Sequence, residues 1–210
     1  MPSPDPDLHG NVPDKSDVAL LLIDVLNDLE FDGGDAILEH AVPMANALRT
    51  LKRRARQAGV PVVYVNDNFG KWRSDFRQQL DHCLNDDVRG RPVVERLVPD
   101  EEDYFVLKPK HSGFYHTTLP VLLEYLEVSK LILTGIATDN CVLYTAADAY
   151  MSDLEVFVPP DCCAAEHTRR HEAALEQMRE TLKADTTPSP ELDLAILSGV
   201  ARRGVEQSLR

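Results

Sequence analysis

The sequence lacks any cluster of lysine and arginine with interleaved aromatic side chains. Lys and Arg total 22 against 35 Asp and Glu, so the formal net charge is −13, and aromatic residues make up only 6% of the chain. Nucleic-acid binding depends on a basic face that neutralises phosphates. The composition therefore argues against a nucleic-acid partner and predicts an acidic protein.

Long hydrophobic runs are also missing. No stretch approaches the roughly 20 apolar residues that a membrane-spanning helix needs. The N-terminal sequence MPSPDPDLHG has neither the basic start nor the apolar core of a secretory signal. We therefore expect no membrane association, and the cytoplasm is the expected compartment.

Cysteine is scarce, and its spacing does not suggest disulfide bonds. The four cysteines are Cys83, Cys141, Cys162 and Cys163, and the last two form an adjacent pair that cannot easily bridge to itself. Such a set is not a disulfide framework and fits a reducing compartment. Cys162 and Cys163 follow a predicted strand, and we interpret them as packing residues.

The chain contains enough apolar sequence for one hydrophobic core. It has 210 residues, of which 43% are hydrophobic, which suits a single domain and is short for two. Residues 1–16 are polar and rich in Pro and Asp, so we interpret them as a flexible N-terminal arm and residues 17–210 as a single domain. Apolar residues from Leu192 to Val200 predict a terminal helix suited to a contact between subunits.

Short apolar runs alternate along this domain with segments of helical periodicity, such as Ala36 to Ala58. Continuous apolar runs are typical of strands buried on both faces of a parallel sheet. The alternation predicts a three-layer α/β/α sandwich, Rossmann-like, with a parallel sheet of five or six strands. The predicted strands are Val18 to Val25, Val62 to Val65, Tyr104 to Leu107, Leu131 to Thr134 and Leu154 to Val158, with a weak sixth candidate at Ala184 to Thr187.

The stretch from Lys130 to Ala149, KLILTGIATDNCVLYTAADA, is typical of a buried strand that runs into a helix, with Cys141 at the junction. Thr138, Asp139 and Asn140 are residue types that cap or enter a helix, which places Cys141 in a first helical turn. Unpaired N–H groups and the positive end of the helix dipole meet there and lower a thiol pKa. Cys141 is therefore a candidate nucleophile, with a small buried hydrophobe as the alternative interpretation.

Two charged residues occupy equivalent places at the ends of other predicted strands. Asp24 interrupts the first run near its end, and Lys108 follows the run that begins at Tyr104. The carboxyl ends of parallel strands meet at one edge of the sheet, where such folds place their ligands. An Asp just beyond a strand also suits a plain surface position. An acid, a cation and a thiol at one edge nevertheless match the surroundings of an activated nucleophile.

Three pieces of sequence around these residues resemble the isochorismatase-like cysteine hydrolases, a family that includes nicotinamidases, N-carbamoylsarcosine amidohydrolase and ureidoacrylate amidohydrolases. The pieces are LLLIDVLND around Asp24, VLKPKHSGFYHTTL around Lys108 and TGIATDNCVLYTAADA around Cys141, and with their spacing they cover residues 18 to about 165. The resemblance implies an isochorismatase-like hydrolase fold for the domain and an Asp24–Lys108–Cys141 catalytic triad. It also implies a cis peptide before Ala137, an oxyanion hole from the backbone N–H groups of Ala137 and Cys141, and assembly into a homodimer or homotetramer.

Departures from the family pattern narrow the expected activity. The metal-dependent nicotinamidases of this family resemble one another in having an Asp and several His residues after the second strand. This chain has NDNFGKWRSDF at that place, without histidine. Asp67 alone is a poor site for a divalent ion, because zinc or iron needs three or four convergent ligands. We therefore expect no metal and no other cofactor, and nicotinamidase activity is disfavoured.

We predict a cysteine hydrolase that cleaves a C–N bond of a small amide, ureide or carbamoyl substrate through a thioester intermediate. The presence of Cys141 favours this branch over isochorismatases that cleave a vinyl ether without a thiol. An isochorismatase-type hydrolase of another small substrate is one alternative, and a non-enzymatic α/β binding protein that keeps the fold is another. A flavodoxin-like nucleotide binder is disfavoured because no Gly-rich phosphate loop follows Val25.

The substrate pocket is predicted from loop position alone. Its expected residues mix apolar and hydrogen-bonding side chains, which suits a small planar amide or carbamoyl compound. The candidates are Phe31, Asn66, Asn68, Trp72, His111, Phe114 and Tyr144. The remaining loop and helix histidines, His116, His167 and His171, receive no role from the sequence.

Overall fold

The computed structural model describes residues 15–68 and 75–199. The predicted N-terminal arm lies outside this range except for its last two residues, and Trp72 and the end of the predicted terminal helix also lie outside it. Within the described residues, no helix is long and apolar enough to cross a membrane.

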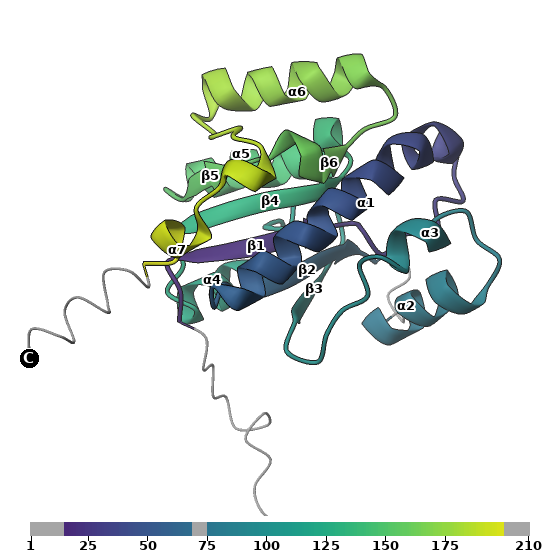
Figure 1. Ribbon diagram of the computed structural model, residues 1–210, viewed down its shortest axis with the longest axis horizontal. Helices are drawn as coiled ribbons and strands as arrows, with labels where there is room; N and C mark the ends of the chain where they lie inside the picture. The colour runs from purple at the N-terminus through teal and green to yellow at the C-terminus, as the bar shows by residue number, and fades with distance from the viewer. Residues whose placement is uncertain (1–14, 69–74, 200–210) are drawn as a thin grey trace, which may run out of the picture.

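A parallel sheet forms the centre of the molecule (Figure 1). The strand order is β3-β2-β1-β4-β5, with β6 beside β4, and every pairing is parallel. The strands are β1 Val18–Ile23, β2 Val62–Asp67, β3 Tyr104–Lys108, β4 Lys130–Ile136, β5 Glu155–Phe157 and β6 Cys163–Ala164. The predicted parallel sheet is confirmed, but its sixth strand is Cys163–Ala164. The segment predicted as a weak strand at 184–187 makes only an isolated bridge between Phe157 and Asp185.

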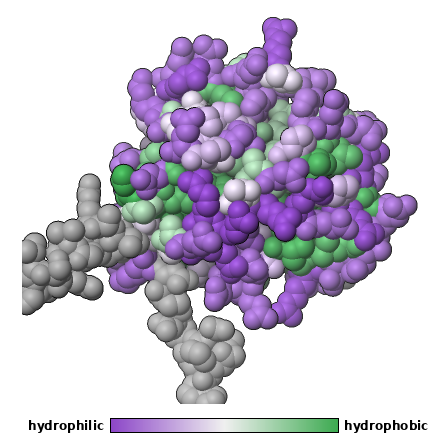
Figure 2. Space-filling model, viewed as in Figure 1, coloured by the Kyte–Doolittle hydropathy of each residue, from purple (hydrophilic) through white to green (hydrophobic). Residues whose placement is uncertain are grey.

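Helices cover both faces of the sheet, which confirms the three-layer architecture (Figure 1). One apolar core includes side chains from α1, α2, α3 and α7, and the other includes side chains from α4, α5 and α6. The helices are α1 Gly34–Gln57, α2 Phe76–Asn85, α3 Arg91–Val94, α4 Leu119–Tyr125, α5 Leu143–Met151, α6 Thr168–Thr181 and α7 Leu194–Leu197, with a π-helical turn at Thr138–Val142 and 3-10 turns at Pro160–Cys162 and Ser189–Glu191. The side of the molecule shown in Figure 2 is mainly hydrophilic, as the acidic composition predicts, with scattered hydrophobic patches.

The continuous apolar run of β1 follows from these two cores. Leu20 and Leu22 point into the core beneath α1, whereas Leu21 and Ile23 point into the core beneath α4 and α5. All four side chains are completely buried. Burial of a leucine or isoleucine side chain contributes roughly 1.5–3 kcal/mol, so a central strand needs apolar residues on both faces.

The strands that carry the predicted triad end at the same edge of the sheet. In the sheet register Ile23 of β1 lies opposite both Val65 of β2 and Gly135 of β4. Gly135 has a φ of 109°, and a Cβ built on it would lie 2.1 Å from the Ile23 carbonyl oxygen. Only glycine fits at this contact, and its absence of a side chain allows β4 to approach β1 closely where both strands end.

Candidate active site

Asp24 is the first residue after β1, and β2 holds it in place. Its φ of 52° lies in the left-handed region, which Asp adopts more readily than most residues. Its backbone N–H donates to the Val65 carbonyl at 3.0 Å. Its Oδ1 accepts a hydrogen bond from the Asp67 N–H at 2.7 Å. The side chain is therefore fixed, and only 5% of the residue is exposed.

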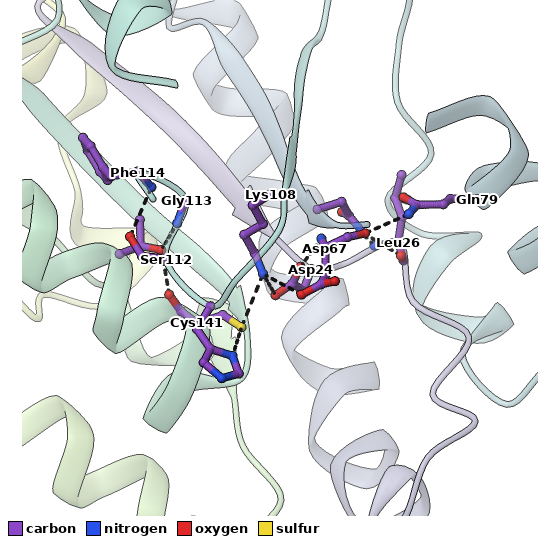
Figure 3. A network of polar contacts seen from close by, with 12 residues as sticks. Asp24, Leu26, Asp67, Gln79, Lys108, Ser112, Gly113, Phe114 and Cys141 are labelled. Carbon is purple, nitrogen blue, oxygen red and sulfur yellow. Dashed lines mark hydrogen bonds and ion pairs between the residues drawn. The ribbon is translucent and has the colours of Figure 1, made fainter. Parts of the chain in front are cut away.

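Lys108 ends β3 and is completely buried. Its Nζ lies 2.8 Å from Asp24 Oδ2 and 3.5 Å from Cys141 Sγ (Figure 3). Burial lowers the pKa of Lys108, but the negative charges around it, led by that of Asp24, outweigh burial and raise the pKa above its usual value. Lys108 therefore remains an ammonium at neutral pH.

Cys141 lies in the π-helical turn Thr138–Val142, between β4 and α5. The Ile136–Ala137 peptide that leads into this turn is cis. The Ala137 carbonyl accepts hydrogen bonds from two residues of the turn, at 3.0 Å from the Asn140 N–H and at 3.2 Å from the Val142 N–H. The predicted first turn of an α-helix is therefore a π-helical turn, a feature that occurs frequently at functional sites.

The thiol of Cys141 is not acidified by this position. Burial first, and then the charge of Asp24, raise its pKa above the ordinary value of 9.0, and Lys108 only partly opposes them. The prediction of a lowered thiol pKa was wrong, because it considered the helix terminus without the burial and the carboxylate that accompany it. The resting site therefore favours a neutral thiol, with the Asp24 carboxylate as the base beside it.

The same surroundings make Asp24 a stronger base than an exposed carboxylate. Burial raises its pKa, and the ion pair with Lys108 lowers it, with burial the larger effect. A carboxylate with a raised pKa accepts a proton more readily. Asp24 and Cys141 are thus arranged for proton transfer from sulfur to oxygen.

Asp67 belongs to this cluster, although the sequence singled it out only as an insufficient metal ligand. Its Oδ2 lies 3.5 Å from Lys108 Nζ, and its backbone N–H is the donor to Asp24. Gln79 Nε2 donates to the Asp67 carbonyl at 2.7 Å. Asp67 is the last residue of β2, whereas the apolar run predicts a strand that ends at Val65 and leaves Asp67 in the loop beyond it.

Two of the predicted pocket residues lie beside the sulfur. His111 Nδ1 is 3.8 Å from Cys141 Sγ. The ring of Tyr144 stacks on the His111 ring with a centroid separation of 5.7 Å. Both residues are exposed, so they form the outer side of the site.

The other predicted pocket residues are placed differently. Asn66 is a correction: it is completely buried, its Nδ2 donates to the Leu26 carbonyl at 2.6 Å, and its Oδ1 accepts from the Leu26 N–H at 3.4 Å. Both ends of its amide therefore bind the backbone after β1. Asn68 is buried, and its N–H donates to the Lys108 carbonyl at 3.0 Å. Phe114 is half-buried against the core beneath α4 and α5, and Phe31 is exposed in the loop before α1.

A histidine on α6 supports the turn that carries the nucleophile. His171 Nδ1 lies 2.8 Å from Thr138 Oγ1. Burial lowers the pKa of His171, which favours the neutral ring, and this ring shares a hydrogen bond with the Thr138 hydroxyl. No role for His171 can be predicted from the sequence, because its contact with Thr138 depends on how α6 packs against the turn.

Comparisons with known proteins agree with this fold. The isochorismatase domain model matches residues 18–188. The uncharacterized isochorismatase family protein YaaI of Bacillus subtilis is 38% identical over 178 residues, which are 85% of this chain and 97% of that protein. The isochorismatase of the same organism is 30% identical over 172 residues, which are 79% of this chain and 54% of that protein.

A solved structure shows the same relationship. The crystal structure of N-carbamoylsarcosine amidase from Thermoplasma acidophilum is 27% identical and superimposes with a TM-score of 0.65, over 84% of this chain and 98% of that one. Residues 18–188, which the isochorismatase domain model matches, include every strand of the sheet and the three residues Asp24, Lys108 and Cys141. The chain therefore belongs to the isochorismatase family of hydrolases.

Proposed function

We propose that this protein is a cysteine hydrolase that cleaves a C–N bond of a small amide, ureide or carbamoyl compound through a thioester. The observation that carries the proposal is the contact of Lys108 Nζ with both Asp24 Oδ2, at 2.8 Å, and Cys141 Sγ, at 3.5 Å. A thiol with a base and a fixed cation beside it is an arrangement that suits covalent catalysis at a carbonyl. The similarity to a protein named as an amidase supports the choice of a C–N bond.

In the first half of the reaction, Asp24 removes the thiol proton as Cys141 Sγ attacks the substrate carbonyl carbon. Negative charge then develops on the carbonyl oxygen, and the backbone N–H groups of Ala137 and Cys141 are the proposed donors to it. Such a donor contributes roughly 3–4 kcal/mol in other oxyanion holes. Asp24 returns its proton to the departing nitrogen, the C–N bond breaks, and the acyl group remains on sulfur as a thioester.

In the second half, water hydrolyses the thioester. Asp24 takes a proton from the attacking water and passes it to the sulfur, which frees the acid and restores the thiol. Lys108 keeps the same charge throughout. Its ammonium stabilises the Asp24 carboxylate before proton transfer and the thiolate of Cys141 after it.

The test is a screen of small amides, ureides and carbamoyl acids for ammonia release, with the parent and the variants Cys141→Ala, Cys141→Ser and Cys162→Ala. We expect Cys141→Ala to abolish turnover. Cys141→Ser should lose nearly all turnover, because a hydroxyl is harder to deprotonate than a thiol. Cys162→Ala is the matched control and should keep the rate within a few-fold. Mass spectrometry of the quenched parent should detect the acyl group on Cys141.

The opposite result is equally clear. A folded Cys141→Ala variant that turned over at the parent rate would exclude the thioester. Direct attack by a water activated by Asp24 would then replace covalent catalysis, and a reaction of the isochorismatase type would become the better assignment.

A further inference from the structure

The sulfur of Cys141 has a polar neighbour that the proposed mechanism does not use. Within the described part of the chain, the side-chain nitrogens within hydrogen-bond distance of Sγ are Lys108 Nζ at 3.5 Å and His111 Nδ1 at 3.8 Å. Lys108 is buried, whereas His111 is exposed. The two nitrogens therefore approach the sulfur from the protein interior and from the solvent side.

Three hydrogen bonds fix the loop that carries His111 relative to the nucleophile. The Ser112 hydroxyl donates a hydrogen bond to the Asp148 carboxylate, and the Gly113 N–H donates one to Thr145 Oγ1 at 3.0 Å. The hydroxyl of Thr145 in turn donates to the Cys141 carbonyl at 2.7 Å. Figure 3 shows Ser112 and Gly113 close to Cys141. The loop and the nucleophile are thus joined through Thr145.

Packing brings the loop close to the sheet and orients the ring. A Cβ built on Gly113 would lie 3.0 Å from Val65 Cγ1 and 3.2 Å from Leu119 Cδ2, so glycine allows the loop to come this near. The His111 ring stacks on Tyr144 at an interplanar angle of 22°. An exposed histidine would otherwise sample several rotamers. Here its backbone and its ring are both held, with Nδ1 toward the sulfur.

We propose that His111 is a further catalytic residue, which donates an Nδ1–H hydrogen bond to the Cys141 thiolate while Asp24 holds the thiol proton. The proton moves from Sγ to the Asp24 carboxylate, and His111 keeps its own proton, so no other group is needed. This inference rests on the proposed function, because it concerns the same nucleophile. Its physical reason is that a thiolate formed in a buried site needs donors to replace water, and Lys108 supplies only one of them.

The test compares two variants of similar size, His111→Asn and His111→Leu. The Nδ2 of Asn can occupy nearly the position of the histidine Nδ1 and donate a hydrogen bond, whereas Leu cannot. Both variants open access to the sulfur alike, so their difference reports the hydrogen bond. The measurement is the second-order rate of Cys141 alkylation by iodoacetamide near pH 7, followed by mass spectrometry, which requires no knowledge of the substrate.

We expect His111→Leu to be alkylated roughly 10-fold or more slowly than His111→Asn, as the loss of a hydrogen bond to a charged group predicts. His116→Asn, an exposed histidine further along the same loop, is the control and should match the parent. Circular dichroism should show that all variants are folded. Equal rates for the Asn and Leu variants, or a faster Leu variant, would overturn the proposal.

The outcome also separates this inference from the proposed function. If iodoacetamide does not alkylate Cys141 of the parent in preference to Cys83, Cys162 and Cys163, the assignment of Cys141 as an activated nucleophile is wrong. If iodoacetamide alkylates Cys141 preferentially and the two His111 variants react at the same rate, the assignment of Cys141 as the nucleophile is kept and only the proposed role of His111 is rejected.

Discussion

At Cys141 the charge of Lys108 and the burial of the thiol act in opposite directions on ionisation, and burial is the larger effect. The thiolate therefore forms only when Asp24 accepts the proton, rather than existing in the resting protein. A neutral thiol on its own reacts far more slowly than a thiolate, so the reactivity of Cys141 depends on Asp24. Asp24 takes the proton as the sulfur attacks an electrophile, whether a substrate carbonyl or iodoacetamide.

The Asp24–Lys108 pair should also contribute to folding stability, in a way that depends on both partners. Lys108→Met leaves Asp24 as an uncompensated buried carboxylate and should destabilise the protein by about 3–5 kcal/mol. The double variant Asp24→Asn with Lys108→Met removes both charges and should regain much of this loss. Denaturant unfolding of the parent, both single variants and the double variant forms the required cycle. Strictly additive changes would contradict a stabilising coupling between the two side chains.

Sequence patterns located Asp24, Lys108 and Cys141 because each lies at or shortly after a strand end, and the apolar runs mark strand ends well. They misassigned Asn66 and overlooked the position of Asp67 in the cluster. In the register of β2 and β3, Asp67 lies opposite Lys108. Register depends on how the strands pair, which a single run of residues does not specify.

Among the secondary-structure elements, the π-helical turn at Thr138–Val142 depends on α6. The hydrogen bond between Thr138 and His171 is a side-chain bond from α6 to this turn. Burial lowers the pKa of His171 below its ordinary value of 6.5. As the pH falls through 6.5, the unfolded chain binds a proton at this site before the folded protein does, so the folded state loses stability.

We therefore expect the midpoint of thermal unfolding to fall more between pH 7.5 and pH 5.5 in the parent than in a His171→Asn variant, in which this group no longer titrates. The exposed His167, one residue before α6, provides the control variant His167→Asn, whose pH dependence should follow that of the parent. Contributions from other groups, such as His82, are common to all three proteins and cancel in the comparison. Identical pH dependence in parent and His171→Asn would remove this histidine as the cause.

The segment after β2 bears on the question of a metal. The sequence NDNFGKWRSDF contains no histidine, and residues 69–74 of it lie outside the described range. We expect activity on an identified substrate to survive dialysis against EDTA. If the rate were lost and then restored by zinc, iron or manganese, the loop would hold a metal that its sequence does not suggest.

The order and type of the main elements followed from periodicity, whereas the smallest ones did not. The five predicted apolar runs became β1 to β5. Burial on both faces explains the runs of β1, β2 and β4, whereas β3 and β5 are partly exposed. Cys163–Ala164 was missed, since a strand of two residues has no periodicity. The sequence predicts an α-helical turn where the π-helical turn lies, because both kinds of turn can begin with the same capping residues. The π-helical turn is recognised only in the structure, where the Ala137 carbonyl accepts hydrogen bonds from both Asn140 and Val142.

For the whole molecule, we expect self-association into a dimer or a tetramer. Two helices on one side of the sheet expose large apolar side chains, with Tyr125 of α4 61% and Met151 of α5 71% exposed. Exposed apolar side chains mark an interface where they form a contiguous patch, and self-association would bury such a patch. Sedimentation at micromolar concentration should detect a species heavier than the 23.5 kDa chain. A purely monomeric profile would contradict the expectation.

The close approach of β1 and β4 has a consequence for how sequence variation is tolerated. The space beside Gly135 is smaller than one methyl group, and the strands it brings together carry the proposed base and lead to the proposed nucleophile. A library of all substitutions at this position, selected for activity, should return glycine alone. Position 135 has no functional group, yet it should be as intolerant of replacement as Cys141, since even alanine would separate the acid from the sulfur.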